Sequence, residues 1–490
     1  MNYLSIDVGT TCCKCQLFSE SGEILAYQSE EYALKAVNSD LYVDVVGIWE
    51  KVRKLIRYAS SRGEVSSICI SSFGEAFVLL SEKDDILFYP MLYTDPRGEE
   101  EAKELTKRFG EEKLFARTGT LPQSMFSVSK LLWIKRHYPD LYARADKVLL
   151  ICDYIGYLLT GERVIDYALA CRTGIFRLEN KQFDEELLGE LGISKSLFSK
   201  PMLTGSIVGS VKESVAKELG ISPKTKLVLG SHDQICSALG AGVVKSGESV
   251  DGLGTVECIT AVFDSRPINV EMGRSGYVCV PYAVDGLYCT YMFNYSSGSL
   301  VNWFRKDILH GYRGEQADFF AYMDETMGEE PSGLLTLPYF AGAATPYQNI
   351  NAKGAILNLT TRTKDSDLYR SILEGTAMEM RVNMEKMREF GVRIERAVAT
   401  GGGANSDRWL QIKADIQNIS IQTLRSSEGG LCGCAILQAV AMGGASSYDE
   451  AVNRFVVTKR QFFPNAERHL SYRESYEKYK KLYDILKEFN

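Results

Sequence analysis

An acidic residue followed by a glycine–threonine turn occurs twice in this sequence, half a chain apart. The first copy is Asp7-Val8-Gly9-Thr10 and the second is Asp251-Gly252-Leu253-Gly254-Thr255. Gly9 and Gly254 are 245 positions apart in a chain of 490 residues. One echoed turn is a weak repeat signal by itself, but it places a domain boundary near residues 242–250. A chain of this length allows about three domains of ~150 residues. The echo favours two, which we predict to span residues 1–245 and 246–490.

The hydrophobic pattern mixes strands and helices in both halves, which is typical of α/β domains. The chain opens with strand-like runs at 3–8, 14–19 and 24–28 separated by turns, so we expect an antiparallel meander. The second half restarts with a strand at 247–250 that leads into the echoed turn. The charged, amphipathic stretch at 473–488 predicts a single terminal helix. Between these segments, the spacing of apolar residues predicts helices at 45–58 and 99–109 and a strand at 396–400.

Composition argues against two classes of partner. Lys plus Arg number 56 and Asp plus Glu 63, for a formal charge of −7, whereas phosphate backbones require a basic surface. No apolar run reaches about 18 residues, so we expect no membrane span. The N-terminus does not resemble a secretory signal, and twelve cysteines without one indicate free thiols in a reducing cytoplasm. Neither Cys12-Cys13-Lys14-Cys15 nor Cys432-Gly433-Cys434 has the CxxC spacing of a metal site.

The first of three motifs that could carry chemistry is Asp7-Val8-Gly9-Thr10-Thr11. A glycine followed by two threonines in a tight hairpin offers backbone N–H groups and two hydroxyls to an anion. A carboxylate just before such a turn would repel phosphate unless a divalent cation lay between them, so the pattern fits a Mg²⁺-nucleotide site. The alternative is an ordinary hairpin turn with an acidic residue at its edge, because short motifs often match by chance.

The second motif is Gly230-Ser231-His232-Asp233-Gln234, between a predicted buried strand and a predicted helix. A carboxylate at this place is held rigidly and is exposed to a cleft. Asp233 could be a general base that orients a substrate hydroxyl for phosphoryl transfer, a reaction that depends mostly on positioning and charge. The alternative is an Asp that caps the N-terminus of the helix.

The third motif is Thr400-Gly401-Gly402-Gly403-Ala404-Asn405-Ser406, between a strand and a helix. Three consecutive glycines let the backbone approach a flat ligand closely. The motif matches neither the Gly-x-Gly-x-x-Gly fingerprint nor the Walker A pattern, so neither of those nucleotide folds is indicated. The alternative, a turn that needs positive φ, accounts for one glycine easily and for three poorly.

Together these residues resemble the FGGY family of carbohydrate kinases, within the larger group that includes sugar kinases, actin and Hsp70-type ATPases. The resemblance covers nearly the whole chain and keeps the family's order of segments. It implies two ribonuclease-H-like (actin-like ATPase) α/β domains that flank a catalytic cleft. The segments that carry it are residues 4–11, 158–162, 230–242, 373–377, 400–406, 409–416 and 433–437.

The resemblance also implies roles for single residues. Asp233 would be the catalytic base and would also touch the substrate, and Asp7 with Asp233 would hold Mg²⁺. The positions that match the family's substrate pocket are Glu75, Tyr93 and Asp95. The positions that match its contacts to ATP are Thr10, Thr11, Gly254, Thr255, Gly298, Asn302, Gly402, Gly403 and Asn405, with Lys14 as a further candidate.

Several positions depart from the family's pattern. Glycerol kinases carry Arg where Gly74 stands and Tyr where Met125 stands, and xylulose kinases carry Met-His in place of Gly74-Glu75. These departures argue against glycerol and xylulose as substrates. The family's Glu-Arg-Thr-Pro is Ala343-Ala344-Thr345-Pro346 here, and its Gly-Thr-Ser ends in Val256.

We therefore predict a cytoplasmic, ATP- and Mg²⁺-dependent kinase of a small sugar or polyol, such as a ketose, pentulose or alditol. Asp233 would serve as base for in-line phosphoryl transfer. The expected partners are the small-molecule substrate and a second copy of the chain in a homodimer, with no nucleic acid and no membrane. Two alternatives stay open at this point. One is a non-kinase ATPase related to actin or Hsp70, and the other is a sugar sensor with weakened turnover.

Overall fold

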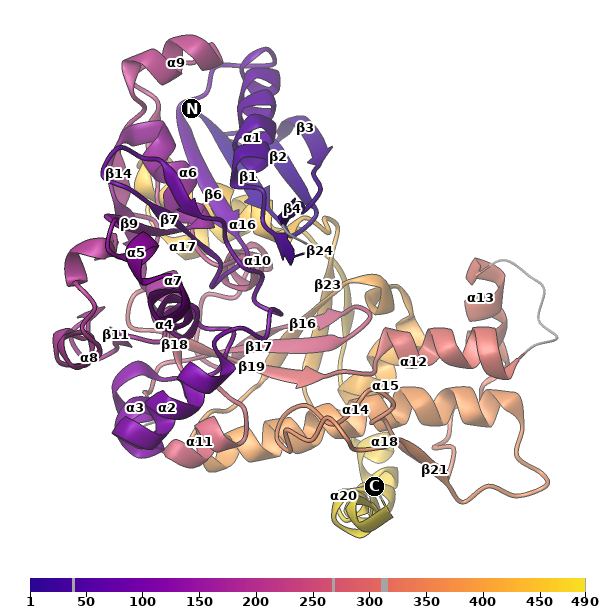
Figure 1. Cartoon of the computed structure of the whole chain (residues 1–490). Coiled ribbons are helices and arrows are strands. Elements are labelled where there is room, and N and C mark those ends of the chain that lie inside the picture. Colours follow the sequence, from indigo (N-terminus) through magenta and orange to yellow (C-terminus); the bar gives the residue numbers. More distant parts are fainter. Residues whose placement is uncertain (38–39, 267–268, 310–315, 490) are drawn as a thin grey trace.

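Two mixed β-sheets form the framework of the protein, one from each half of the chain (Figure 1). The structure is a computed structural model that describes residues 1–37, 40–266, 269–309 and 316–489. In spatial order, the first sheet consists of β14 (Ile207–Ser210), β15 (Lys226–Val228), β6 (Ser67–Ser72), β1 (Asn2–Val8), β2 (Cys12–Ser19) and β3 (Ile24–Glu31). The second sheet consists of β18 (Val280–Pro281), β19 (Tyr288–Asn294), β17 (Glu257–Phe263), β16 (Glu248–Leu253), β22 (Arg396–Thr400), β23 (Ser420–Leu424) and β24 (Thr458–Phe462).

The predicted opening meander is confirmed, because β1 pairs antiparallel with β2 and β2 with β3. β1 also pairs in parallel with β6, and β16 repeats this arrangement by pairing antiparallel with β17 and in parallel with β22. The echoed turns thus close corresponding hairpins in the two sheets. One boundary was wrong: β16 continues to Leu253, so Asp251 lies inside the strand and the turn begins only at Gly254.

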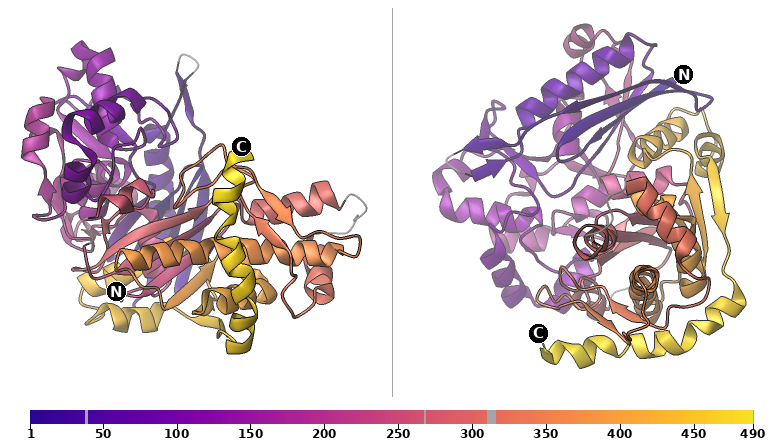
Figure 2. Two further views of the ribbon diagram at one scale, coloured as in Figure 1. Left: turned by 90° about the horizontal axis from the view of Figure 1, so that it is seen from below. Right: turned by 90° about the vertical axis from the view of Figure 1, so that its right-hand side faces the viewer.

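A helix from the end of the chain covers the first sheet. On β1, Ile6 pairs with Cys15, whose thiol lies 3.8 Å from a carbonyl of α1 (Val45–Ser60). The neighbouring Ser5 contacts Gln438 of α16 (Gly429–Ala441). Adjacent side chains of a strand point to opposite faces, so α1 and α16 cover opposite faces of this sheet, as the views in Figure 2 also show. The predicted division between residues 245 and 246 stays a prediction. α16 belongs to the second half of the sequence, but it packs against the sheet of the first half.

Further elements lie between β6 and β15 in the sequence. A small sheet is formed by β8 (Ile86–Phe88), β7 (Phe77–Leu80) and β9 (Lys147–Leu150). The helices of this region are α2 (Glu99–Phe109), α3 (Glu111–Thr118), α4 (Ser127–His137), α5 (Pro139–Tyr142), α6 (Ile151–Thr160), α7 (Tyr167–Cys171), α8 (Glu185–Leu191) and α9 (Glu213–Leu219). The first half ends with α10 (Asp233–Gly240), and the second half adds α11 (Val270–Arg274), α12 (Gly298–Trp303), α13 (Gln316–Thr326), α14 (Asp365–Glu389), α15 (Asp407–Gln417) and α17 (Tyr448–Phe455).

The chain does not end in the single helix that the sequence predicts. It forms α18 (Ala466–Ser471), α19 (Arg473–Tyr479) and α20 (Leu482–Leu486) instead. The break follows from tertiary contacts, because the aromatic side chains on its two sides have different partners. The Tyr479 hydroxyl donates to Glu379 at 2.6 Å, whereas Tyr483 stacks on Tyr347 with ring centroids 3.8 Å apart.

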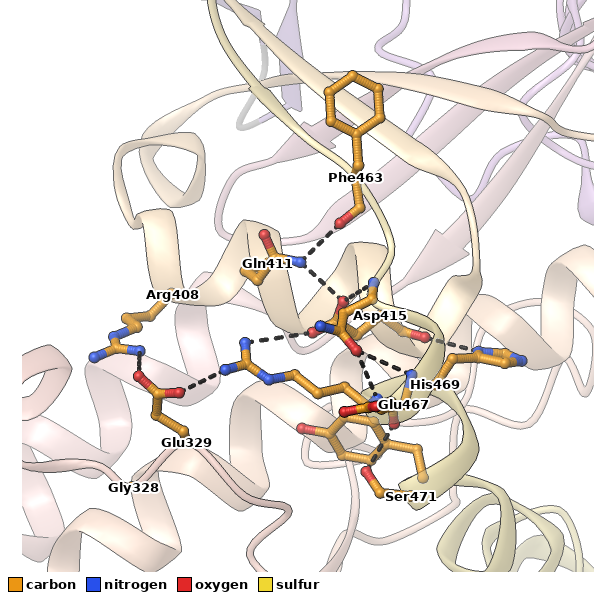
Figure 3. Close-up of polar contacts among 12 residues, drawn as sticks. Gly328, Glu329, Arg408, Gln411, Asp415, Phe463, Glu467, His469 and Ser471 are labelled. Atoms are coloured by element: carbon orange, nitrogen blue, oxygen red, sulfur yellow. Dashed lines mark hydrogen bonds and ion pairs between the residues drawn. The ribbon is translucent and has the colours of Figure 1, made fainter.

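A polar network fastens these last helices to α15 (Figure 3). The Asp415 carboxylate accepts hydrogen bonds from Gln411 Nε2 and the backbone N–H of Asn465, both at 2.8 Å. Arg468 of α18 contacts Glu329 at 2.6 Å, and Arg408 of α15 contacts the same carboxylate at 3.5 Å. The helix that follows the glycine turn is therefore held at both ends. None of the helices in the described parts of the chain combines the length and the apolar character needed to cross a membrane.

Candidate active site

Asp233 is the first residue of α10, which follows β15 of the first sheet after a four-residue connection. His232 occupies the N-cap position and makes no capping hydrogen bond, so the helix-cap alternative for Asp233 is not what the structure shows. Within the described ranges, the one hydrogen bond that the Asp233 carboxylate accepts comes from the neighbouring Gln234 N–H, at 2.6 Å. Its side chain is 35% exposed, yet the surrounding protein raises the pKa of this carboxyl to about 6. Such a group is a fitting acceptor for a hydroxyl proton near neutral pH.

Asp7 is the last residue but one of β1, and it lies near enough to Asp233 for the two charges to interact. Its Oδ1 atom is buried and has no hydrogen-bond partner among the described residues. Burial first, and then the nearby charge of Asp233, raise the pKa of Asp7 to about 6. Two such carboxylates close together disfavour each other's ionisation unless a cation compensates them. Oxygen donors of this kind fit Mg²⁺, so Asp7 and Asp233 are suited to hold it, with water completing the coordination.

The β1–β2 turn places Thr10 and Thr11 beside Asp7. The turn is closed by a 2.9 Å hydrogen bond from the Gly9 N–H to the Cys12 carbonyl, and Thr11 is exposed. Lys14 lies farther along β2, where its ammonium contacts both oxygens of Glu428 at 3.1 Å. Glu428 immediately precedes α16, so this ion pair joins the two halves of the chain.

The second half contains a cavity of about 820 Å³. It brings together the predicted nucleotide residues Gly254, Thr255, Gly298, Asn302, Gly402, Gly403 and Asn405. Thr10, Thr11 and Lys14 are not among its lining residues and belong to the facing half. The remaining lining comes from residues that sequence reasoning did not single out as ligands, among them Phe320, Asp324, Tyr369 and Trp409. No motif marks α13, which supplies Phe320 and Asp324.

Glycines shape this cavity by allowing close approach of the backbone. A Cβ atom on Gly298 would lie 2.4 Å from the Gly254 carbonyl oxygen, and one on Gly403 would lie 2.7 Å from the Trp409 ring. Gly401 has φ of +82°, which disfavours other residues. Gly402, in contrast, would meet nothing within 4 Å and borders open space. Gly401 is thus explained by its positive φ and Gly403 by close packing, whereas Gly402 lines the cavity.

A fully buried ion cluster flanks the echoed turn at Gly254 and Thr255. Lys413 Nζ is 3.0 Å from Asp251 and also contacts Glu257, and all three side chains are 0% exposed. Glu257 further accepts a 3.1 Å hydrogen bond from Ser297, the residue before α12. Burial raises the pKa of Glu257 to about 7, although Lys413 acts to lower it. The sequence did not single out Lys413, because its partners lie far away along the chain.

Glu75, which the sequence predicts to bind the acceptor, is buried and has φ of +63°. Its carboxylate forms an ion pair with Arg172, a residue that the sequence analysis missed. The Ser127 hydroxyl of α4 donates to the Glu75 carbonyl at 2.8 Å. His232 lies next to this pair, and its Nε2 atom is 3.3 Å from Asp233. Burial, helped by Arg172, lowers the pKa of His232 to about 4.

Tyr93 and Asp95 lie on a loop attached to the same helix. Lys130 of α4 donates to the Asp95 carbonyl at 2.7 Å. The Asp95 carboxylate is bound by Arg97 through Nε at 2.9 Å and Nη2 at 2.5 Å. Burial acts to raise the pKa of Asp95, but the hydrogen bonds from Arg97 outweigh it and lower the pKa. Tyr93 is 40% exposed.

Comparison with known proteins decides the family. Sequence models of the FGGY family of carbohydrate kinases match the chain twice, the N-terminal domain at residues 2–240 and the C-terminal domain at residues 253–442. The chain belongs to the FGGY family of carbohydrate kinases. It is accordingly an ATP-dependent sugar kinase with the mixed α/β, two-domain, actin-like fold of that family, as the sequence predicts. The alternative of a non-kinase ATPase is not supported.

Relatives in the family act on different sugars. The chain is 26% identical to a xylulose kinase of Bacillus subtilis over 99% of its own length and 97% of the relative's. It is 29% identical to a gluconokinase of Bacillus licheniformis over 96% and 93% of the two lengths. The solved xylulose kinase of Rhodospirillum rubrum superimposes with a TM-score of 0.92 at 25% identity, covering 100% of this chain and 99% of that one.

Proposed function

We propose that this FGGY kinase transfers the γ-phosphoryl group of ATP to a hydroxyl of a small sugar or polyol (a ketose, pentulose or alditol), with Asp233 as the base. The observation that carries the proposal is the pair of acidic groups at the end of β1 and the start of α10. Asp7 Oδ1 is buried without a hydrogen-bond partner, and Asp233 is accessible beside it. Both pKa values are raised to about 6, so Asp233 can accept a proton that the substrate hydroxyl loses.

The nucleotide is assigned to the cavity of the second half. Its glycine-rich walls can lie against the flat base and the ribose, and the turns at Thr10–Thr11 and Gly254–Thr255 offer N–H groups and hydroxyls to the phosphates. Lys14 is already paired with Glu428, so we expect it to support the turn electrostatically. Mg²⁺, when bound by Asp7 and Asp233, supplies charge compensation for the phosphates.

The acceptor is assigned to the first half. Glu75 and Asp95 would accept hydrogen bonds from substrate hydroxyls, and the Tyr93 ring would form an apolar wall. Asp233 orients the attacking hydroxyl in line with the phosphoryl group and takes its proton. Catalysis then rests on positioning and charge compensation, which dominate phosphoryl transfer.

Three further expectations accompany this proposal. The two functional units are proposed to be residues 1–245 and 246–490, joined between α10 and β16. The reaction is proposed to take place in the cytoplasm, where ATP is available and the twelve thiols would stay reduced. A homodimer remains a prediction from the sequence.

The test is ADP release by purified protein with Mg²⁺-ATP and a panel of polyols, ketoses and sugar acids, followed by Asp233→Asn on the best acceptor. Removal of a general base lowers kcat by about 10²–10⁴. Asp140→Asn, on the surface helix α5, is the matched control and should retain activity. Near-wild-type turnover by D233N would show that the base is another residue.

A further inference from the structure

The two arginines described near the proposed acceptor site, Arg172 and Arg97, each form an ion pair with a carboxylate. Arg172 and Glu75 are both almost fully buried, with side chains 8% and 3% exposed. Arg172 Nε and Nη2 both contact Glu75 Oε1. The Arg172 guanidinium lies between the rings of Phe126 and Tyr291, at 5.2 and 5.9 Å from their centroids. Its position is therefore fixed, and its charge is neutralised within the protein.

Arg97, the second arginine near the proposed acceptor site, is also bound by other residues of the protein. Arg97 binds Asp95 through Nε and Nη2, and its Nη1 atom lies 3.1 Å from Asp40 and 2.7 Å from the Tyr42 hydroxyl. Lys130 is buried, and its ammonium donates to two backbone carbonyls, those of Asp95 at 2.7 Å and Arg97 at 3.4 Å. These contacts leave no basic side chain aimed at a ligand carboxylate among the described residues of this region.

The groups next to Asp233 include the uncharged His232, which blocks a longer side chain at position 74. A Cβ atom on Gly74 would lie 2.9 Å from His232 Cδ2, so His232 occupies the space that a longer side chain at position 74 would need. The Tyr291 hydroxyl lies 3.5 Å from His232 Nδ1 on the side toward the second sheet. An arginine could not be accommodated at position 74 without displacing the imidazole.

Among the described residues of this region, no cation is left to meet a ligand carboxylate. Glu75 and Asp95 are each balanced by an arginine, two backbone carbonyls bind the Lys130 ammonium, and Asp7 and Asp233 are assigned to Mg²⁺. A carboxylate substituent on the acceptor would lose its hydration without gaining a cation that compensates its charge, which is costly. Hydroxyl groups face no such penalty, because they can donate to Glu75 and Asp95 and accept from neutral donors.

We propose that the acceptor is an uncharged polyol or ketose and not an aldonate, and that Arg172 determines this preference by its pairing with Glu75. Glu75 Oε1 is held by Arg172, and we assign Oε2 to a substrate hydroxyl. The inference rests on the proposed function, in which Glu75 and Asp233 border the acceptor. It excludes sugar acids from the proposed substrates. Sequence similarity does not decide this point, because the relatives include both xylulose kinases and gluconokinases.

The experiment compares matched acceptors that differ only in the charged group. For each four- to six-carbon configuration, the alditol or ketose is assayed beside the aldonate, with saturating Mg²⁺-ATP. We expect kcat/KM for the best uncharged acceptor to exceed that for its aldonate by about 100-fold or more. A preference for the aldonate overturns the inference while the kinase function stands. Failure to phosphorylate any member of the panel instead refutes the proposed function, and the inference with it.

A variant tests the role of the ion pair. Glu75→Gln leaves the Arg172 charge without its partner, so the ratio of uncharged to aldonate kcat/KM should fall by about tenfold or more. The matched control is Glu179→Gln, because Glu179 pairs with Arg177 on the surface at 2.8 Å with side chains 64% and 36% exposed. This control should leave the ratio within about twofold of wild type. An unchanged ratio in E75Q overturns the role of Arg172, and the wild-type ratio still tests the substrate class if E75Q does not fold.

Discussion

Lys413 is expected to be one of the most stabilising charged residues of the second half. Its ammonium is 3.0 Å from Asp251 and contacts Glu257, with all three side chains 0% exposed. Lys413→Met would leave two buried carboxylates without a cation. Breaking a buried ion pair in this way costs about 3–5 kcal/mol, and each kcal/mol corresponds to roughly 2–4 °C in Tm for a unit of ~150–250 residues. We therefore expect K413M to lower the Tm by roughly 6–20 °C near pH 8, measured by scanning calorimetry.

The loss should shrink as the pH falls. Burial already raises the pKa of Glu257 to about 7 with Lys413 present, and removal of Lys413 would raise it further. The unfolded value is about 4.3. Between the two values the folded protein binds more protons than the unfolded chain, so stability decreases as pH rises. The Tm difference between wild type and K413M should be smaller near pH 5 than near pH 8.

A matched exposed lysine provides the control. Lys386 pairs with Glu389 at 2.8 Å, but the two side chains are 34% and 63% exposed, so Lys386→Met should change the Tm by about 2 °C at most. Adding Glu257→Gln to K413M should restore part of the lost stability, because one uncompensated charge disappears. The reasoning is refuted if K413M melts within about 2 °C of wild type near pH 8, or if its deficit grows on acidification.

Three shorter predictions concern the ligand sites. Asp7→Asn should raise the Mg²⁺ concentration for half-maximal activity by about tenfold or more without lowering the Tm, because it removes an unpaired buried charge; a drop in Tm with unchanged Mg²⁺ dependence would make Asp7 structural. Gly403→Ala should lower the Tm and raise the KM for ATP, because its Cβ would lie 2.7 Å from the Trp409 ring. The control Gly402→Ala should leave the Tm within about 1 °C of wild type. Equal Tm losses in the two variants would contradict the packing argument. Gly298→Ala should weaken ATP binding about tenfold or more, since its Cβ would lie 2.4 Å from the Gly254 carbonyl; isothermal titration with ATP checks this, and unchanged affinity would contradict it.

The sequence was most informative where a signal is local. The period of apolar residues located α2 and β22 at the bounds that the structure has, 99–109 and 396–400. Of the seven predicted residues that line one cavity, Gly254, Thr255, Gly402, Gly403 and Asn405 lie in the glycine turns, whereas Gly298 and Asn302 came from the resemblance to the FGGY family. These signals are readable because strand alternation, helical spacing and close backbone approach each depend on a few neighbouring residues.

The sequence was least informative where partners are far apart along the chain. Arg172 lies 97 positions from Glu75, and Lys413 lies 156 positions from Glu257. No periodicity or spacing connects such residues, so the ion pairs that neutralise the acceptor side and stiffen the second turn were not predicted. The same holds for α13, whose side chains complete the cavity without any motif. The terminal helix was predicted as one because the breaks depend on contacts with α14.

The echoed turn differs between the two halves by one residue. Asp7 lies two positions before Gly9, whereas Asp251 lies three positions before Gly254. Successive side chains of a strand point to opposite faces, so a shift of one position turns a side chain to the other face. Measured from the turn, the two aspartates must therefore face in opposite directions, although the motifs look alike.

This difference accounts for the unequal roles proposed for the halves. Asp7 lies near Asp233 and has a buried oxygen without a hydrogen-bond partner among the described residues, whereas Asp251 is fully buried and pairs with Lys413. The residue of the second half at the place of Asp7, two positions before the turn glycine, is Gly252, which has no side chain. The second turn can therefore offer backbone groups and a threonine hydroxyl to a nucleotide but no carboxylate to a metal. If Mg²⁺ is held by carboxylates at the phosphates, these must come from the first half, which also contains the proposed base Asp233.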